Sequence, residues 1–178
     1  MNIMLIILAV IAGGVCLLFI VGLFSKKSYA IERSVTIQKP VPDVFNYIRF
    51  LKNQDNYNKW VMMDPNMKKD FKGIDGTTGF IYGWDGNNKA GAGEQEIKQI
   101  EFGNHVDVEV RFKRPFKGIA HSLMKTMHDK QESTIVKWRF TSELKYPANI
   151  FLLLFNPEKT LGRDLESSLT NLRIQLEK

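Results

Sequence analysis

A run of 22 uncharged, mostly apolar residues opens the chain, from Ile3 to Phe24. At about 1.5 Å of rise per residue, a helix of this length spans about 33 Å, close to the hydrocarbon thickness of a bilayer. The run therefore predicts a transmembrane helix. A cleaved signal peptide is the alternative, but it normally has a basic start and a shorter apolar region, and neither is present here. We expect a retained, single-pass membrane anchor at residues 3–24.

The first charged side chains, Lys26 and Lys27, follow the apolar run directly. Lysine is enriched on the cytoplasmic flank of membrane helices, so we expect the remainder of the chain to face the cytoplasm. The alternative is that the short N-terminus inserts the other way and leaves the domain outside. We predict two parts, an anchor with its basic flank at residues 1–27 and one folded domain at residues 28–178. The second part has the size of one ordinary domain, which excludes a multidomain enzyme. The single cysteine, Cys16, lies in the apolar run, so no disulfide framework is expected.

Residues 28–178 have the pattern of a sheet followed by a long helix. Apolar and polar residues alternate over 80–84, 106–112 and 134–140, which predicts antiparallel strands with one apolar face. The segment Asp85-Gly86-Asn87-Asn88 suits a hairpin turn. A short amphipathic helix is expected from Val41. After Pro147, leucines at 161, 165, 169, 172 and 176 have helical spacing and predict a terminal helix whose apolar stripe covers the sheet.

Several of these segments carry a family resemblance. They are Pro42-Asp43-Val44-Phe45, Lys59-Trp60, the aromatic and glycine-rich runs at 79–87 and 91–97, the strand at 134–140 and the terminal helix. Together they resemble the SRPBCC or START-like superfamily over residues 29–178, and in particular its polyketide cyclase/dehydrase subgroup. The resemblance implies an α+β helix-grip fold, with a curved antiparallel sheet of about seven strands around a long C-terminal helix and an apolar cavity between them. It predicts the fold and leaves the chemistry open, because one fold hosts many activities.

The apolar face of the predicted strands is the candidate ligand-binding surface. We predict that a pocket is lined by Phe80, Tyr82, Trp84, Val108, Val110, His121, Val136, Trp138 and Phe140. Plain core packing is the alternative for aromatic residues at this spacing. Tyr82 and Trp84 carry polar groups that could orient a ligand oxygen, and His121 is the one histidine expected to point inward.

Motifs for catalysis, metal binding or phosphate binding are absent from the sequence. No catalytic residue, metal or cofactor is therefore predicted. Arg111, Lys113, Arg114 and Lys117 form a basic cluster that could meet anionic headgroups or nucleic acid. A solvated hairpin end is the preferred interpretation, and no nucleic-acid partner is expected.

Six consecutive apolar residues at 150–155 are too few to span a membrane. They predict either a buried turn before the terminal helix, which is preferred, or a lid at the cavity mouth that touches the bilayer. The leading hypothesis is a non-enzymatic, membrane-anchored domain that binds a lipid or another hydrophobic small molecule. The alternatives are a cyclase/dehydrase-like enzyme using Tyr82, His121 or Trp84, and a structural or partner-binding module with a filled core. The oligomeric state is left open.

Overall fold

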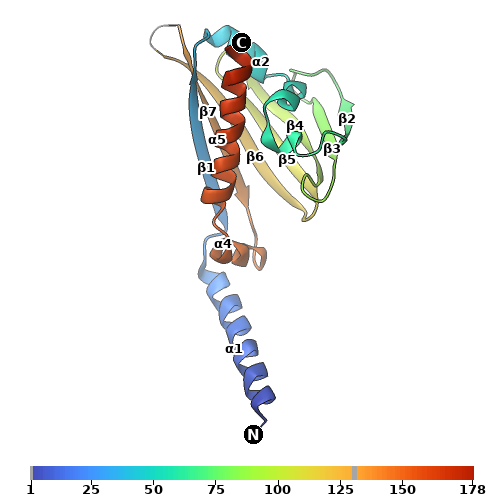
Figure 1. The fold of residues 1–178 in the computed structure, drawn as a ribbon, viewed down its shortest axis with the longest axis vertical. Coiled ribbons are helices and arrows are strands. Elements are labelled where there is room, and N and C mark those ends of the chain that lie inside the picture. The colour runs from blue at the N-terminus through green and yellow to red at the C-terminus, as the bar shows by residue number, and fades with distance from the viewer. Residues whose placement is uncertain (1, 130–131) are drawn as a thin grey trace.

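Helix α1 (Ile3–Phe24) projects away from the rest of the molecule (Figure 1). The computed structural model describes residues 2–129 and 132–178, so residue 1 of the predicted anchor lies outside it. Leucine, isoleucine and valine are exposed all around α1, and Gly22 near its end is its only buried residue. Such a helix is stable where its surroundings are apolar. By length and composition α1 can cross a membrane, a property that retained anchors and signal sequences share.

Seven antiparallel strands form one curved sheet, in the order β1-β7-β6-β5-β4-β3-β2. They are β1 (Ser28–Ile37), β2 (Lys68–Lys72), β3 (Ile81–Asp85), β4 (Ala92–Glu101), β5 (His105–Arg114), β6 (Gly118–His128) and β7 (Thr134–Glu143). Strands β2 to β7 pair in sequence order, and β1 closes the order by pairing with β7. Register shifts between β4 and β5 bend the sheet. The predicted α+β class and strand number are confirmed.

Helix α5 (Pro157–Leu176) lies along the sheet against β1 (Figure 1). The side chain of Asn156 caps its first turn, accepting a hydrogen bond from the Lys159 amide at 3.1 Å. Leu165, Leu169 and Leu172 are fully buried beneath it. The predicted terminal helix and its leucine stripe are therefore confirmed.

The remaining helices are short and flank the sheet. They are α2 (Val41–Ile48), the 3-10 helix η1 (Leu51–Asn56), α3 (Lys59–Met62), the 3-10 helix η2 (Ala148–Ile150) and α4 (Phe151–Leu154). The first three follow one another between β1 and β2 and cover the part of the sheet that α5 leaves free (Figure 1). The last two join β7 to α5 and lie beside the end of α1.

Candidate ligand-binding pocket

A cavity of about 260 Å³ lies between the sheet, the η1–α3 segment and the start of α5. This is the volume of roughly nine water molecules, near the lower end of small-molecule sites. Its walls are mostly apolar and include Val61, Met67, Phe112 and Leu161. The described residues contain no group of three or more His, Cys, Asp or Glu side chains that could hold a metal.

Five of the predicted pocket residues line this cavity: Tyr82, Trp84, Val110, Trp138 and Phe140. Three others, Phe80, Val108 and Val136, are on the same face of the sheet but lie in the closed core, where they are 1%, 4% and 0% exposed. At these three positions the apolar residue of the alternating pattern packs against neighbouring core side chains and does not face the cavity. Five of the nine predicted residues thus line the cavity, and these three pack in the core.

His121 points away from the cavity, so the expectation that it faces inward is wrong. In β6 the inward positions are Ala120, Ser122 and Met124, all buried, and His121 between them is exposed. Successive side chains of a strand alternate between the two faces, so His121 falls on the outer face. It cannot touch a ligand in the cavity.

The polar groups of Tyr82 and Trp84 have protein partners. The Tyr82 hydroxyl donates to Asp55 Oδ1 at 2.7 Å, and Trp84 Nε1 donates to the Ala90 carbonyl at 3.2 Å. Burial of the ring, and then the Asp55 carboxylate, raise the pKa of the Tyr82 hydroxyl well above its ordinary value. The two residues therefore hold the wall of the cavity and leave no polar group directed at a ligand.

A cluster of three amide side chains, Gln54, Asn58 and Gln95, supplies polar groups that the sequence analysis missed. All three line the cavity and are 4%, 6% and 7% exposed. The amides of Gln54 and Gln95 bond to each other in both directions, at 3.2 and 3.0 Å, and Asn58 Nδ2 donates to Gln54 Oε1 at 2.9 Å. The sequence contained one signal for this cluster: Gln95 occupies an inward position of β4, where an apolar residue is usual.

The exposed residues of the lining, which we take as the mouth of the cavity, lie at the end of the domain that carries α1. The exposed residues of its lining are Lys89, Arg114 and Pro115, in the β3–β4 and β5–β6 connections. Strand β1 starts next to α1, and the antiparallel order places both of these connections at that same end (Figure 1). Antiparallel pairing thus fixes the direction in which the pocket opens.

Solved structures resemble the domain, although no protein-family model and no curated protein matches the chain. A protein from Thermobifida fusca aligns with a TM-score of 0.63 at 12% identity, over 83% of this chain and 92% of that one. Norcoclaurine synthase from Thalictrum flavum, in complex with dopamine and hydroxybenzaldehyde, aligns with 0.62 at 11%, over 88% and 92%. Ara h 8.0201 aligns with 0.59 at 12%, over 84% and 97%.

The domain has the helix-grip fold. At these identities the likeness shows the fold alone, and this is the fold that the sequence resemblance predicted. The helix-grip arrangement of sheet and terminal helix leaves the cavity between them, and the residues that line it decide what it can hold.

Residues 150–155 are mostly exposed and are not a buried turn, so the preferred interpretation of this segment is wrong. Phe151 and Leu154 in α4 are 59% and 69% exposed. The Phe151 ring lies 6.1 Å from that of Phe116, which directly follows Pro115 at the mouth. Because α4 lies beside α1 at the base of the helix-grip domain, its apolar side chains extend the apolar surface of that helix (Figure 1).

Asn149, which is fully buried, joins the base of the domain to the end of α1. Its Nδ2 donates to the Gly22 carbonyl at 2.6 Å and to Ser25 Oγ at 2.9 Å. The Gly22 carbonyl belongs to the last turn of α1, where carbonyls lack a helical partner. This bonding attaches the helix to the domain through a side chain as well as through the backbone.

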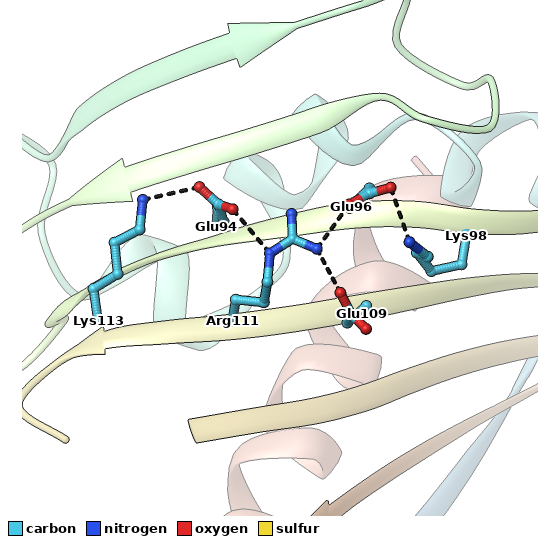
Figure 2. Close-up of polar contacts among 6 residues, drawn as sticks. All are labelled: Glu94, Glu96, Lys98, Glu109, Arg111 and Lys113. Carbon is cyan, nitrogen blue, oxygen red and sulfur yellow. Dashed lines mark hydrogen bonds and ion pairs between the residues drawn. The ribbon is translucent and has the colours of Figure 1, made fainter. Parts of the chain in front are cut away.

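The predicted basic cluster does not form a free cationic patch. Figure 2 shows the Arg111 guanidinium between Glu94 at 2.8 Å, Glu96 at 2.7 Å and Glu109 at 2.5 Å, on the outer face of β4 and β5. Lys113 pairs with Glu94 at 2.8 Å. Hydrogen bonds from Lys113 and then Arg111 lower the pKa of the Glu94 carboxyl below its ordinary value.

The other two basic residues lie at the β5–β6 connection. Arg114 pairs with Asp85 and also donates to the Gly86 carbonyl at 3.0 Å. Lys117 is exposed. Most of this positive charge is therefore compensated within the helix-grip domain, in agreement with the preference for a solvated surface.

Proposed function

We propose that this protein is a membrane-anchored, non-enzymatic binding domain for an apolar or amphipathic small molecule, such as a lipid or hydrophobic metabolite. The observation that carries the proposal is the cavity of about 260 Å³, which is lined by mostly apolar side chains and has its exposed lining residues at the end of the domain that carries α1. A filled core would leave no such space. Burial of apolar ligand surface in it supplies the binding free energy.

The anchor and the pocket mouth belong to one arrangement. Helix α1 has the length of a membrane span, and Lys26 and Lys27 after it favour a domain on the cytoplasmic side. The contact of Asn149 with the last turn of α1 supports a helix that remains part of the working protein. With α1 in a bilayer, the mouth opens toward the lipid from which a hydrophobic ligand enters.

Exposed apolar side chains at the base of the domain support this orientation. Phe116, Phe151, Leu154 and Phe155 are 74%, 59%, 69% and 47% exposed, and the Phe116 ring, which follows Pro115 of the lining, lies 6.1 Å from that of Phe151. A contiguous apolar surface next to a membrane helix is typical of a part that rests in the lipid interface. We assign this basal surface, defined by these four residues, to contact with the bilayer.

The composition of the lining supports binding over catalysis. The described lining residues include no carboxylate and no histidine, the side chains that most often move protons near neutral pH. Asp55 lies outside the lining and is occupied by Tyr82 and by Lys69, whose ammonium is at 2.7 Å. Two residues named for the cyclase-like alternative, Tyr82 and Trp84, line the cavity, but their polar groups donate to Asp55 and to the Ala90 carbonyl.

A cavity-filling variant tests the proposal in the full-length protein. Val110 lines the cavity and is 8% exposed, so Val110→Phe places a ring in the space for ligand. The matched control is Ile174→Phe, an exposed position near the end of α5 and outside the lining. Each protein is isolated in native nanodiscs, extracted with organic solvent, and its small molecules are compared by mass spectrometry.

We expect at least one small molecule that accompanies the wild type and the Ile174→Phe protein and is strongly depleted from the Val110→Phe protein. The thermal stability of all three proteins is measured by tryptophan fluorescence, so that loss of the fold is recognised. If the three folded proteins yield the same extract, the proposed pocket function is wrong and a filled or unused cavity is the better description.

A further inference from the structure

The three amides in the cavity come from two separate parts of the chain. Gln54 and Asn58 lie in and just after η1, and Gln95 lies in the middle of β4, 41 residues from Gln54 in sequence. Each is more than nine-tenths buried, and each faces the cavity. Burying an amide is costly unless its hydrogen-bonding capacity is used, so three together at an apolar wall need an explanation.

Counting donors and acceptors shows what the cluster has left over. Three amide groups carry six N–H donors, and the bonds among them use three. Gln54 Oε1 already accepts from Gln95 and Asn58, and Asn58 Oδ1 accepts from the Trp60 amide at 3.0 Å. Gln95 Oε1 accepts only from Gln54, so among the described residues the cluster keeps three of its six N–H donors and two of its six acceptor positions unused.

The charges around the three amides limit which ligand group can bind to them. The basic residues of the lining, Lys89 and Arg114, are exposed at the mouth, and Arg114 pairs with Asp85. An ionised carboxylate beside the buried amides would be left without a neighbouring counter-charge, because both basic residues of the described lining are exposed at the mouth, and an unpaired buried charge is very costly. A neutral oxygen that accepts hydrogen bonds matches the unused N–H donors.

We propose that Gln54, Asn58 and Gln95 form the polar subsite of the pocket and bind a neutral carbonyl group of the ligand, as found in ketones, aldehydes and esters. This rests on the proposed function, because it assigns the polar end of the ligand that the pocket holds. The apolar remainder of the ligand then extends along Trp84, Phe112 and Phe140 toward the mouth.

A pair of probes with the same shape tests the subsite. 2-Acetylnaphthalene carries a carbonyl oxygen, and 2-ethylnaphthalene replaces that carbonyl with a methylene group. Their affinities for the full-length protein in phosphatidylcholine nanodiscs are measured by calorimetry, with empty nanodiscs as the reference for partition into lipid. We expect the wild type to bind the ketone at least about fivefold more tightly than the hydrocarbon, the effect of one additional hydrogen bond.

A variant then assigns the preference to the amides. Gln95→Met keeps a side chain of similar length and removes its N–H donors. The matched control is Gln99→Met, in the same strand but exposed. We expect Gln95→Met to bind the hydrocarbon as well as the wild type does and to lose the preference for the ketone, whereas Gln99→Met keeps it. Gln95→Met leaves Gln54 without its amide partner. If the protein unfolds for this reason, the double variant Gln54→Met/Gln95→Met is tested in its place.

Each other result overturns the proposal. Equal binding of both probes by the wild type shows that the amides do not recognise a carbonyl group, although the proposed binding of hydrophobic ligands in the pocket is not contradicted. A ketone preference that survives in folded single or double variants places the recognition elsewhere in the cavity. Binding of neither probe by the folded wild type argues against the pocket function as well as the subsite.

Discussion

Replacing Arg111 with methionine should destabilise the domain in a way that depends on pH. Arg111 is 27% exposed and bridges Glu94, Glu96 and Glu109 across β4 and β5 (Figure 2). Methionine keeps much of the packing of the arginine stem and removes the charge. The variant therefore loses the three ion pairs and leaves three carboxylates close together.

The size of the effect follows from the exposure of these pairs. A partly exposed ion pair contributes up to about 1 kcal/mol, and three pairs that share one guanidinium, with the repulsion that its removal leaves, amount to about 2 kcal/mol at pH 7. The pKa values of Glu94 and Glu96 are lowered in the folded protein, chiefly by hydrogen bonds from Lys113 and Arg111. The stabilisation is thus present above the ordinary carboxyl pKa of 4.5 and is lost as the pH falls through the lowered values.

Thermal unfolding of the full-length protein in non-ionic micelles measures this effect. The chain has three tryptophans, all outside α1, so their fluorescence reports on the domain. We expect Arg111→Met to lower Tm by about 4–8 °C at pH 7 and by much less near pH 3. Lys98→Met is the control, because Lys98 makes one pair at 3.0 Å and is 44% exposed, and its Tm should change by about 1 °C. A loss in Arg111→Met that is equal at both pH values would refute the electrostatic reasoning.

Three further predictions concern the core, the pocket wall and the basal surface. Leu169→Ala should lower the free energy of unfolding by about 2–5 kcal/mol, measured by denaturant titration, because Leu169 lies on the buried face of α5 and is 1% exposed. Tyr82→Phe should reduce the loss of Tm that the wild type shows above pH 10. Burial and then Asp55 raise the pKa of the Tyr82 hydroxyl in the folded protein, so the neutral hydroxyl stabilises the fold fully below the ordinary pKa of 10.0, and this stabilisation is lost as the pH rises beyond it. Leu154→Asp should slow uptake of 2-acetylnaphthalene from nanodiscs, measured by stopped-flow fluorescence, with Tm retained. Ile174→Asp should not slow it, because Ile174 is also apolar and exposed but lies near the end of α5 that is far from α1 (Figure 1).

Periodicity predicted most of the fold because each element presents one buried face. Leu165, Leu169 and Leu172 recur at helical spacing, and the structure buries all three. Alternation in β5 and β7 likewise separated the inner face from the outer one. In β6 the alternation did not separate the two faces. The outer positions Leu123 and Met127 are also apolar and half-buried, so both faces of the strand are partly apolar and the pattern does not identify the inner one.

The pocket was harder to predict, because its contents depend on contacts between distant parts of the chain. Nothing near Gln54 marks it as a pocket residue, and its partner Gln95 is brought to it only by the folding of η1 onto β4. The apolar segment at 150–155 was misplaced for a different reason. The preference for a buried turn assumed that water surrounds the domain, whereas the segment lies next to α1.

Under the proposed function, the position of α1 in the sequence determines which end of the helix-grip domain meets the membrane. Because α1 precedes β1, the start of β1, the end of β7, the β5–β6 and β3–β4 connections and the start of α5 all lie at its end of the domain (Figure 1). The C-terminus of α5 lies at the opposite end. An anchor attached after α5 would thus turn the pocket mouth away from the lipid, toward water. Under the proposed function, the N-terminal placement of α1 is what allows a hydrophobic ligand to pass between bilayer and pocket without crossing water.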